Sequence, residues 1–261
     1  MSVFPLLSSL LPGVPLQALE ETGSTNSDAR DWLIRGAAHG SLVAAARQGA
    51  GRGRLGRSFA SGAGGIYMSV VLRSDQPAGV LTTLCAVAVR RAVKELTGRA
   101  LDIKWVNDLQ WQGKKVCGIL CEGVWQGSRP LGVVAGIGLN VCQREFPTEL
   151  RDIACSLYPD GQPPQPLEAF IAAIHRHMMA LLESAPAHLA EYRAACVTLG
   201  RRVSWQTPEG PREGLARDVD EEGALLIDTA EGSVRIAAGE VSVRASREER
   251  GGRSEELGIR N

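Results

Sequence analysis

Glycines and arginines alternate in residues 46–57, which read Ala-Arg-Gln-Gly-Ala-Gly-Arg-Gly-Arg-Leu-Gly-Arg. The segment has neither a helical nor a strand period, so we predict a loop. Glycine lets a backbone approach a ligand closely, and arginine offers a planar set of donors suited to phosphate or carboxylate. We therefore expect a mobile loop that closes over an anion. For this stretch alone, a Gly/Arg-rich nucleic-acid segment or a solvated linker is the alternative.

Other polar residues that could meet a ligand stand at strand ends and at one helix start. They are Ser24, Thr25 and Asn26 at the helix, Gln48 in the loop, Lys104, Asn107 and Asp108 after one strand, and Lys115 opening the next. The sequence contains no Ser-His-Asp set, catalytic carboxylate pair, zinc set or Walker loop, so it offers no obvious nucleophile. Cations for phosphate, with Asp108 for Mg²⁺, fit the activation of a carboxylate by ATP.

The composition indicates a soluble globular protein of 261 residues, with room for one large domain and a small one. Lys+Arg and Asp+Glu are both 29, and this balance argues against bulk polyanion binding. The cysteines show no CxxC spacing, which favours buried free thiols. The sequence has neither a signal-peptide pattern nor a run of membrane-spanning length, so we expect a cytoplasmic protein that binds no membrane.

Strands with short connections and occasional helices should position the polar residues. We expect strands at 16–20, 42–46, 64–72, 101–109, 114–122 and 131–141, with a hairpin turn at Gln112-Gly113. We expect helices at 28–35 with Ser24 or Thr25 as N-cap, at 80–96 ending at Gly98, at 167–182 and at 186–199. The fold class is therefore α+β with a mixed, largely antiparallel sheet. Gly136-Ile137-Gly138 is too short for a dinucleotide fingerprint.

The composition changes at Gly200 to five short alternating strands, at 202–206, 214–218, 224–228, 233–237 and 240–244. Such spacing predicts a small β-barrel. We therefore divide the chain into a main domain at 1–198, a barrel at 199–246 and a charged tail at 247–261 that is expected to be disordered. His175 and His177 cannot share a helix face, so we expect solvated or edge positions rather than a metal pair.

Six segments, in order, resemble those of biotin protein ligases. They are Ser24-Thr25-Asn26, residues 51–57 (Gly-Arg-Gly-Arg-Leu-Gly-Arg), 104–108 (Lys-Trp-Val-Asn-Asp), 115–120 (Lys-Val-Cys-Gly-Ile-Leu), 136–140 (Gly-Ile-Gly-Leu-Asn) and 239–244 (Gly-Glu-Val-Ser-Val-Arg). The resemblance spans roughly residues 17–246. It implies a class II synthetase-like biotin/lipoate ligase fold for 1–198 and an SH3-like β-barrel for 199–246.

The resemblance also implies a two-step reaction. Biotin and MgATP would give biotinyl-5′-AMP, from which biotin passes to a lysine of the biotin carboxyl carrier domain of acetyl-CoA carboxylase or a related carboxylase. The reaction would need ATP and Mg²⁺, with biotin as the substrate, and it would need no prosthetic group. The first matching segment begins at Ser24, which leaves no room for an N-terminal DNA-binding domain, so we expect no sequence-specific DNA binding. The resemblance is compatible with a protein that is either a monomer or a homodimer.

Roles follow position by position from the resemblance. Catalysis would fall to Lys115, Arg52 and Arg54. Biotin would be bound by Ser24, Thr25, Asn26, Gln48, Arg52, Gly53, Arg54, Lys115 and Gly118, and the adenylate by Arg54, Arg57, Lys104, Asn107 and Asn140, with Asp108 near Mg²⁺. Glu240 and Arg244 would lie where the barrel faces the catalytic domain.

Three positions depart from the family pattern. Val106, Leu55 and Phe59 stand where proline, arginine and tryptophan are common. A lipoate or octanoate protein ligase or transferase would share the fold, but the loop and the barrel favour biotin. A nucleic-acid-binding protein with a Gly/Arg loop is the alternative from another class, and the zero net charge counts against it.

Overall fold

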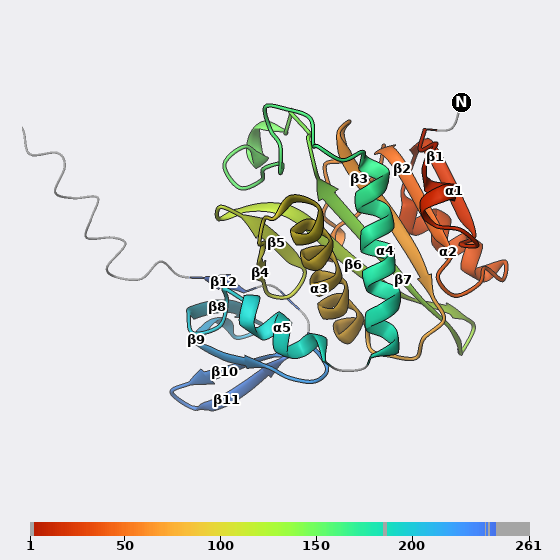
Figure 1. Cartoon of the computed structure of the whole chain (residues 1–261). Helices are drawn as coiled ribbons and strands as arrows, with labels where there is room; N and C mark the ends of the chain where they lie inside the picture. Colours follow the sequence, from red (N-terminus) through yellow and green to blue (C-terminus); the bar gives the residue numbers. More distant parts are fainter. Residues whose placement is uncertain (1–2, 185–186, 238, 240, 244–261) are drawn as a thin grey trace, which may run out of the picture.

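A computed structural model describes residues 3–184, 187–237, 239 and 241–243, which form two sheets with helices around the larger one (Figure 1). The larger sheet has seven strands in the order β1-β2-β3-β7-β6-β5-β4. Its strands are β1 (Leu16–Thr22), β2 (Leu42–Gln48), β3 (Gly65–Leu72), β4 (Asp102–Lys104), β5 (Asp108–Trp111), β6 (Lys114–Gln126) and β7 (Arg129–Asn140). Only β1 and β2 pair in parallel, so the expected mixed, largely antiparallel sheet is confirmed.

Helices cover both faces of this sheet. They are α1 (Leu7–Leu10), α2 (Thr25–Ile34), α3 (Ala78–Thr97), α4 (Leu167–Glu183) and α5 (His188–Ala195), with short 3-10 turns at Arg54–Gly56 and Thr148–Leu150. Helices α3 and α4 lie side by side over one face, and α2 packs on the other (Figure 1). No helix in the described ranges is both long and apolar enough to span a membrane.

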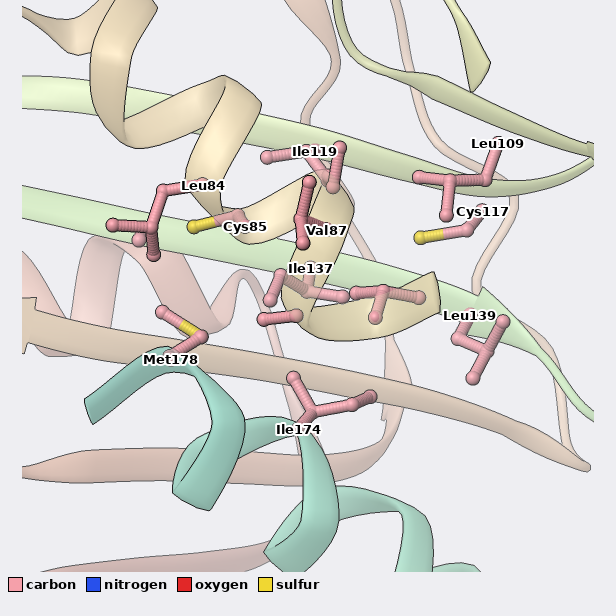
Figure 2. Close-up of a cluster of buried hydrophobic side chains, with 14 of the residues drawn as sticks. Leu84, Cys85, Val87, Leu109, Cys117, Ile119, Ile137, Leu139, Ile174 and Met178 are labelled. Carbon is pink, nitrogen blue, oxygen red and sulfur yellow. The ribbon is translucent and has the colours of Figure 1, made fainter. Parts of the chain in front are cut away.

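The core between α3, α4 and the central strands is mainly apolar (Figure 2). Leu84 and Val87 of α3 meet Ile119 and Ile137 of the sheet, with Ile174 on the α4 side, and all five are almost fully buried. Each such side chain contributes about 1.5–3 kcal/mol through its removal from water. The apolar residues whose periodic spacing predicted α3 and α4 are therefore the residues that pack these helices against the sheet.

The region expected to be one strand at 101–109 contains two strands with a turn between them. β4 ends at Lys104, and β5 begins at Asp108, which pairs back with Lys104. The single-strand expectation is therefore wrong. The expected hairpin turn at Gln112 and Gly113 is confirmed, with φ of +52° and +78°, the left-handed values of a two-residue hairpin.

His175 also differs from expectation. Its exposed fraction is only 4%, and its Nε2 lies 2.8 Å from the carbonyl oxygen of Gly40. Burial lowers the pKa of His175, which favours a neutral ring that ties α4 to the turn before β2. His177 lies at the edge instead, with Nε2 2.7 Å from Glu95 Oε2.

The smaller sheet is five-stranded and antiparallel, in the order β11-β10-β9-β8-β12. Its strands are β8 (Arg202–Thr207), β9 (Gly210–Val219), β10 (Leu225–Thr229), β11 (Gly232–Ile236) and β12 (Ser242–Val243). In the described part of the chain, β11 and β12 are its two edges and do not pair, so the expected closed barrel is not observed. Glu240, Arg244 and the tail at 247–261 lie outside the described residues.

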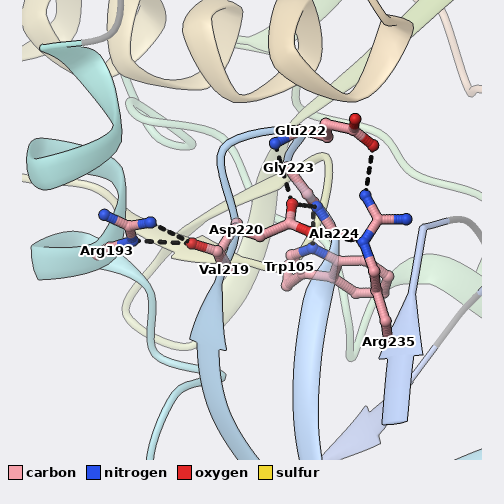
Figure 3. Close-up of polar contacts among 8 residues, drawn as sticks. All are labelled: Trp105, Arg193, Val219, Asp220, Glu222, Gly223, Ala224 and Arg235. Carbon is pink, nitrogen blue, oxygen red and sulfur yellow. Dashed lines mark hydrogen bonds and ion pairs between the residues drawn. The ribbon is translucent and has the colours of Figure 1, made fainter.

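The turn between β9 and β10 docks the smaller sheet onto the larger unit (Figure 3). Asp220 Oδ1 accepts the N–H groups of Glu222 and Ala224, which fixes the shape of the turn. The carbonyl oxygen of Gly223 accepts the indole N–H of Trp105 at 3.0 Å. A Cβ at Gly79, at the start of α3, would lie 2.3 Å from the carbonyl oxygen of Glu222, so only glycine permits this approach.

Candidate active site

A cavity of about 500 Å³ opens on the α2 side of the larger sheet. All of the site residues expected from the sequence line it: Ser24, Thr25, Asn26, Gln48, Arg52, Gly53, Arg54, Arg57, Lys104, Asn107, Asp108, Lys115, Gly118 and Asn140. These residues come from α2, the glycine loop and the central strands, so the fold brings together segments that are far apart in the chain.

Gln48 fixes one end of the cavity at the start of α2. Its Oε1 accepts the backbone N–H of Thr25 at 2.8 Å and lies 3.1 Å from Thr25 Oγ1. Its Nε2 donates to Ser61 Oγ at 2.9 Å. Ser24 occupies the N-cap position, as expected, but its side chain makes no capping hydrogen bond. The Gln48 side chain therefore meets the first turn of the helix.

Asn26 is held on both sides of its amide. Its Nδ2 donates to Glu122 Oε2 at 2.8 Å and to the carbonyl oxygen of Leu120 at 3.3 Å. Its Oδ1 accepts the hydroxyl of Ser69 at 2.7 Å. Buried amides are costly unless both ends are paired, so this network fixes the orientation of Asn26.

Gly136 of β7 leaves the space that the Asn26 amide fills. A Cβ at Gly136 would lie 2.0 Å from Asn26 Oδ1. If biotin binds in this cavity, as the sequence resemblance implies, Gly136→Ala should displace Asn26 and weaken biotin binding at least about tenfold, since one or two buried hydrogen bonds are lost. Isothermal titration with biotin measures this. Gly161→Ala, in the segment before α4 where no atom lies within 4 Å of a Cβ and φ is not in the left-handed region, is the control for a glycine change.

The glycine loop reaches across the cavity. Arg52 Nη2 lies 2.7 Å from Glu122 Oε1 on β6, and Arg54 Nη1 donates to Asn107 Oδ1 at 3.3 Å. Gly53 N–H donates to the carbonyl oxygen of Arg57 at 2.7 Å, which closes a tight turn around Leu55. Arg52 is thus paired with the sheet, and Arg54 with the turn between β4 and β5.

Phe59 forms an apolar shelf in the cavity. A Cβ at Gly138 would lie 2.5 Å from its ring, and one at Gly118 would lie 2.9 Å from it. These facing glycines on β7 and β6 therefore provide the space for the ring. Lys115 Nζ lies 5.7 Å from the ring centroid. The shelf suits an apolar ligand whose charged end reaches Lys115.

Lys115 and Asp108 form an ion pair in the cavity wall, with Nζ and Oδ1 2.7 Å apart. Asn107 is held to β6 because its Nδ2 donates to the carbonyl oxygen of Ile119 and its carbonyl oxygen accepts the N–H of Ile119, each at 2.9 Å.

Tyr192 of α5 supports the turn between β4 and β5, because its hydroxyl donates to the carbonyl oxygen of Val106 at 3.0 Å. Burial raises the pKa of Tyr192 well above its usual value, so its phenol remains a donor.

Asn140 presents a buried oxygen to the same cavity. Its Nδ2 donates to the carbonyl oxygen of Cys155 at 3.2 Å, while Oδ1 accepts no hydrogen bond from the described residues. Phe146, Leu150 and Ile153 add apolar lining. Within the described ranges, no three His, Cys, Asp or Glu side chains gather as a metal cage.

The sequence did not identify Glu122, Ser61 and Ser69 as site residues. Glu122 carried a usable signal, because it is an acid that directly follows an apolar strand run, 116–121. The two serines carried none, since serine is common in strands and loops. They became recognisable only through their contacts with Gln48 and Asn26.

Comparisons with known proteins agree with this geometry. The model of the "Biotin/lipoate A/B protein ligase family" matches residues 19–140, and that of the "Biotin protein ligase C terminal domain" matches residues 198–244. The biotin--[acetyl-CoA-carboxylase] ligase of Mycobacterium tuberculosis is 35% identical over 87% of this chain and 88% of its own length. The bifunctional ligase/repressor BirA of Bacillus subtilis is 35% identical over 84% of this chain and 71% of its own.

Solved structures give the same result. A biotin protein ligase from Aquifex aeolicus, in complex with biotin and ATP, superposes with a TM-score of 0.75 at 30% identity. The match covers 89% of this chain and 99% of that one. The family segments noted in the sequence, the site geometry and these relatives agree: the chain belongs to the biotin protein ligase family.

Proposed function

We propose that this protein activates biotin with ATP and transfers it to a lysine of a biotin carboxyl carrier domain. The observation that carries the proposal is the convergence of the family's polar segments on one cavity with an apolar shelf. Relatives at 35% identity include a biotin--[acetyl-CoA-carboxylase] ligase. The acceptor we propose is therefore the carrier domain of acetyl-CoA carboxylase or a related carboxylase.

Biotin would enter with its bicyclic ring toward α2. The ureido group has donors and an acceptor, which match the hydroxyls of Ser24 and Thr25 and the Gln48 amide. Asn26, in the first turn of α2, would line the same end of the cavity. Phe59, packed over Gly118 and Gly138, would cover the apolar ring. The carboxylate would then point toward Lys115.

In the first step a biotin carboxylate oxygen attacks the α-phosphorus of ATP, and the bond from that phosphorus to the β-phosphate oxygen breaks to release pyrophosphate. Lys115 would balance the charge that develops on the α-phosphate, with Arg52 and Arg54 at the loop. Arg57, Lys104, Asn107 and Asn140 would hold the nucleotide, whose adenine suits the apolar lining at Phe146.

In the second step the carrier lysine ε-amine, in its neutral form, attacks the carbonyl carbon of the mixed anhydride. The carbon–oxygen bond to AMP breaks, AMP leaves, and the amide nitrogen loses a proton. The closed glycine loop would keep water from the anhydride until the lysine arrives.

Magnesium would come with the nucleotide rather than occupy a protein cage. Asp108 is paired with Lys115, and the unpaired Asn140 oxygen is a neutral donor in the same cavity. One carboxylate together with phosphates is the usual way in which proteins hold Mg²⁺, so the residues fit the ion in that form. When bound, the ion would neutralise phosphate charge.

A biotin-dependent exchange of labelled pyrophosphate into ATP tests the first step. Exchange that requires biotin supports the proposal, whereas exchange driven by lipoate or octanoate would move the protein to the other branch of the fold. We also propose that 1–198 is the catalytic domain and that the five-stranded sheet in 199–246 is an SH3-like module. The whole protein would act as a monomer or a homodimer.

We expect no sequence-specific DNA binding by this chain at physiological salt. Its formal net charge is zero, so no bulk excess of cations is available to contact phosphates. Specific binding to duplex DNA draws on cations that contact several phosphates. An electrophoretic mobility shift assay with operator fragments measures this, and a nanomolar complex on one defined fragment would contradict it.

A further inference from the structure

Glu122 contacts two parts of the site at once without lining the cavity itself. One carboxylate oxygen lies 2.7 Å from Arg52 Nη2 in the glycine loop, and the other accepts Asn26 Nδ2 at 2.8 Å. We propose that Glu122 is a positioning residue that clamps the glycine loop to the biotin end of the site. This proposal rests on the proposed function for the identity of the ligand, but both contacts of the clamp are made between residues of the chain itself.

The backbone at Glu122 is held in place because Glu122 belongs to β6, which pairs with β7. Glu122 pairs with Val134 of β7, and two residues earlier Leu120 pairs with Gly136. Leu120 also accepts a hydrogen bond from Asn26, so the amide is held to β6 at two points. The carboxylate is therefore anchored on the sheet, and its partner Arg52 lies in the glycine loop.

The two contacts have different consequences for the reaction. The Asn26 contact belongs to the network of Ser69 that shapes the biotin end. The Arg52 contact holds the loop across the cavity through a carboxylate of the chain itself rather than through a ligand phosphate. Part of the cost of ordering this glycine-rich loop would then be met before the ligand binds. Glu122 would also slow loop opening once the adenylate has formed.

Glutamine at this position separates the two contacts. A carboxylate accepts at both oxygens, whereas an amide has one acceptor and one donor group. In Glu122→Gln the oxygen can remain with Asn26, but the amide NH₂ would face the Arg52 guanidinium, which has no acceptor. Glu122→Ala removes both contacts. The two variants should therefore differ in biotin affinity but not in loop opening.

The first measurement is the initial rate of tryptic cleavage after Arg52, Arg54 or Arg57 in the full ligand-free chain. The Arg52–Glu122 pair is partly exposed, with side chains 46% and 31% accessible, so a modest effect is expected. We expect cleavage and release of preformed biotinyl-AMP to be about three- to fivefold faster in Glu122→Gln. Biotin Kd by calorimetry should stay within about twofold in this variant and rise about tenfold in Glu122→Ala.

Glu95→Gln is the matched control. Glu95 also bridges two side chains, Arg176 and His177, but on the surface between α3 and α4. It should leave loop cleavage and adenylate release unchanged. Near-ultraviolet circular dichroism checks that each variant is folded.

A second measurement needs no variant. Salt screens an exposed ion pair, so raising the salt concentration should accelerate loop cleavage in the wild-type chain relative to a small peptide substrate of trypsin. Unchanged cleavage in Glu122→Gln, or no salt effect in the wild type, would overturn the clamp. Failure of the proposed function looks different, because the wild type would then show no biotin-dependent pyrophosphate exchange while loop cleavage could still respond to Glu122.

Discussion

Lys115→Ala is expected to slow adenylate formation by on the order of a hundredfold or more, with a smaller loss of biotin affinity. The ammonium would act on charge that develops at the α-phosphate, so its effect falls mainly on the transition state. The ion pair adds a second cost, because Asp108 loses the cation 2.7 Å from its Oδ1 and would face the incoming phosphates alone. Single-turnover formation of biotinyl-AMP, measured beside biotin Kd, gives both quantities.

Lys114→Ala is the matched control for this variant. Lys114 is the preceding residue on the same strand, yet its Nζ donates to the carbonyl oxygen of Arg151 outside the cavity. It should form the adenylate at the wild-type rate. A Lys115 variant that did the same would remove this lysine from the mechanism.

Arg54→Gly is expected to release biotinyl-AMP at least about tenfold faster and to label bystander proteins. Arg54 reaches Asn107 across the cavity, so its loss removes a cation and a link between the loop and the turn before β5. An added glycine also raises the entropy of the open loop. The escaped anhydride would then react with exposed lysines. Blotting for biotin on an added non-substrate protein, beside the carrier domain, measures the leak.

Leu55→Gly separates the cation from loop flexibility. Leu55 is 72% exposed with φ of +54°, so glycine removes a side chain that packs on little and suits the backbone. The Leu55→Gly variant should still label only the carrier domain.

Biotin with ATP should also protect the wild-type loop from trypsin after Arg52, Arg54 or Arg57. Equal cleavage with and without ligand, together with a faithful Arg54→Gly, would show that the loop is not a lid.

Periodicity predicted α3 and α4 well because burial is what fixes them, whereas the helix expected at 186–199 spans only His188–Ala195 and α1 was not expected. Helix α4 was expected at 167–182 and spans Leu167–Glu183, since its apolar face is its contact with the core. The turn at Trp105 was missed because apolar residues on both sides continue a strand-like run. What turns the chain there is distant: Thr198, Tyr192 and Gly223 each bond to Trp105 or Val106.

In the site too, the sequence predicted which residues take part but not the contacts that orient them. Arg52, Lys115 and Gly118 could be named from the sequence because their types and order match a family pattern. Asn26 could be named as well, but its held orientation could not, since Glu122 and Ser69 are remote in the chain. Gly136 and Gly138 could be placed in a family segment and are too few for a dinucleotide fingerprint, but the sequence did not predict their structural role. Their purpose is spatial instead, because a Cβ at either position would meet Asn26 or Phe59.

The contact between Trp105 and Gly223 has a consequence for how the molecule denatures. The indole N–H is buried, and its acceptor belongs to the smaller sheet, so melting that sheet alone would leave the donor unpaired at a cost of about 1–3 kcal/mol. Melting it would also empty the space beside Gly79 that the turn fills without any side chain. The two sheets should therefore lose their structure in one cooperative step, and amide exchange in β10 should report on the same global opening as amide exchange in β6.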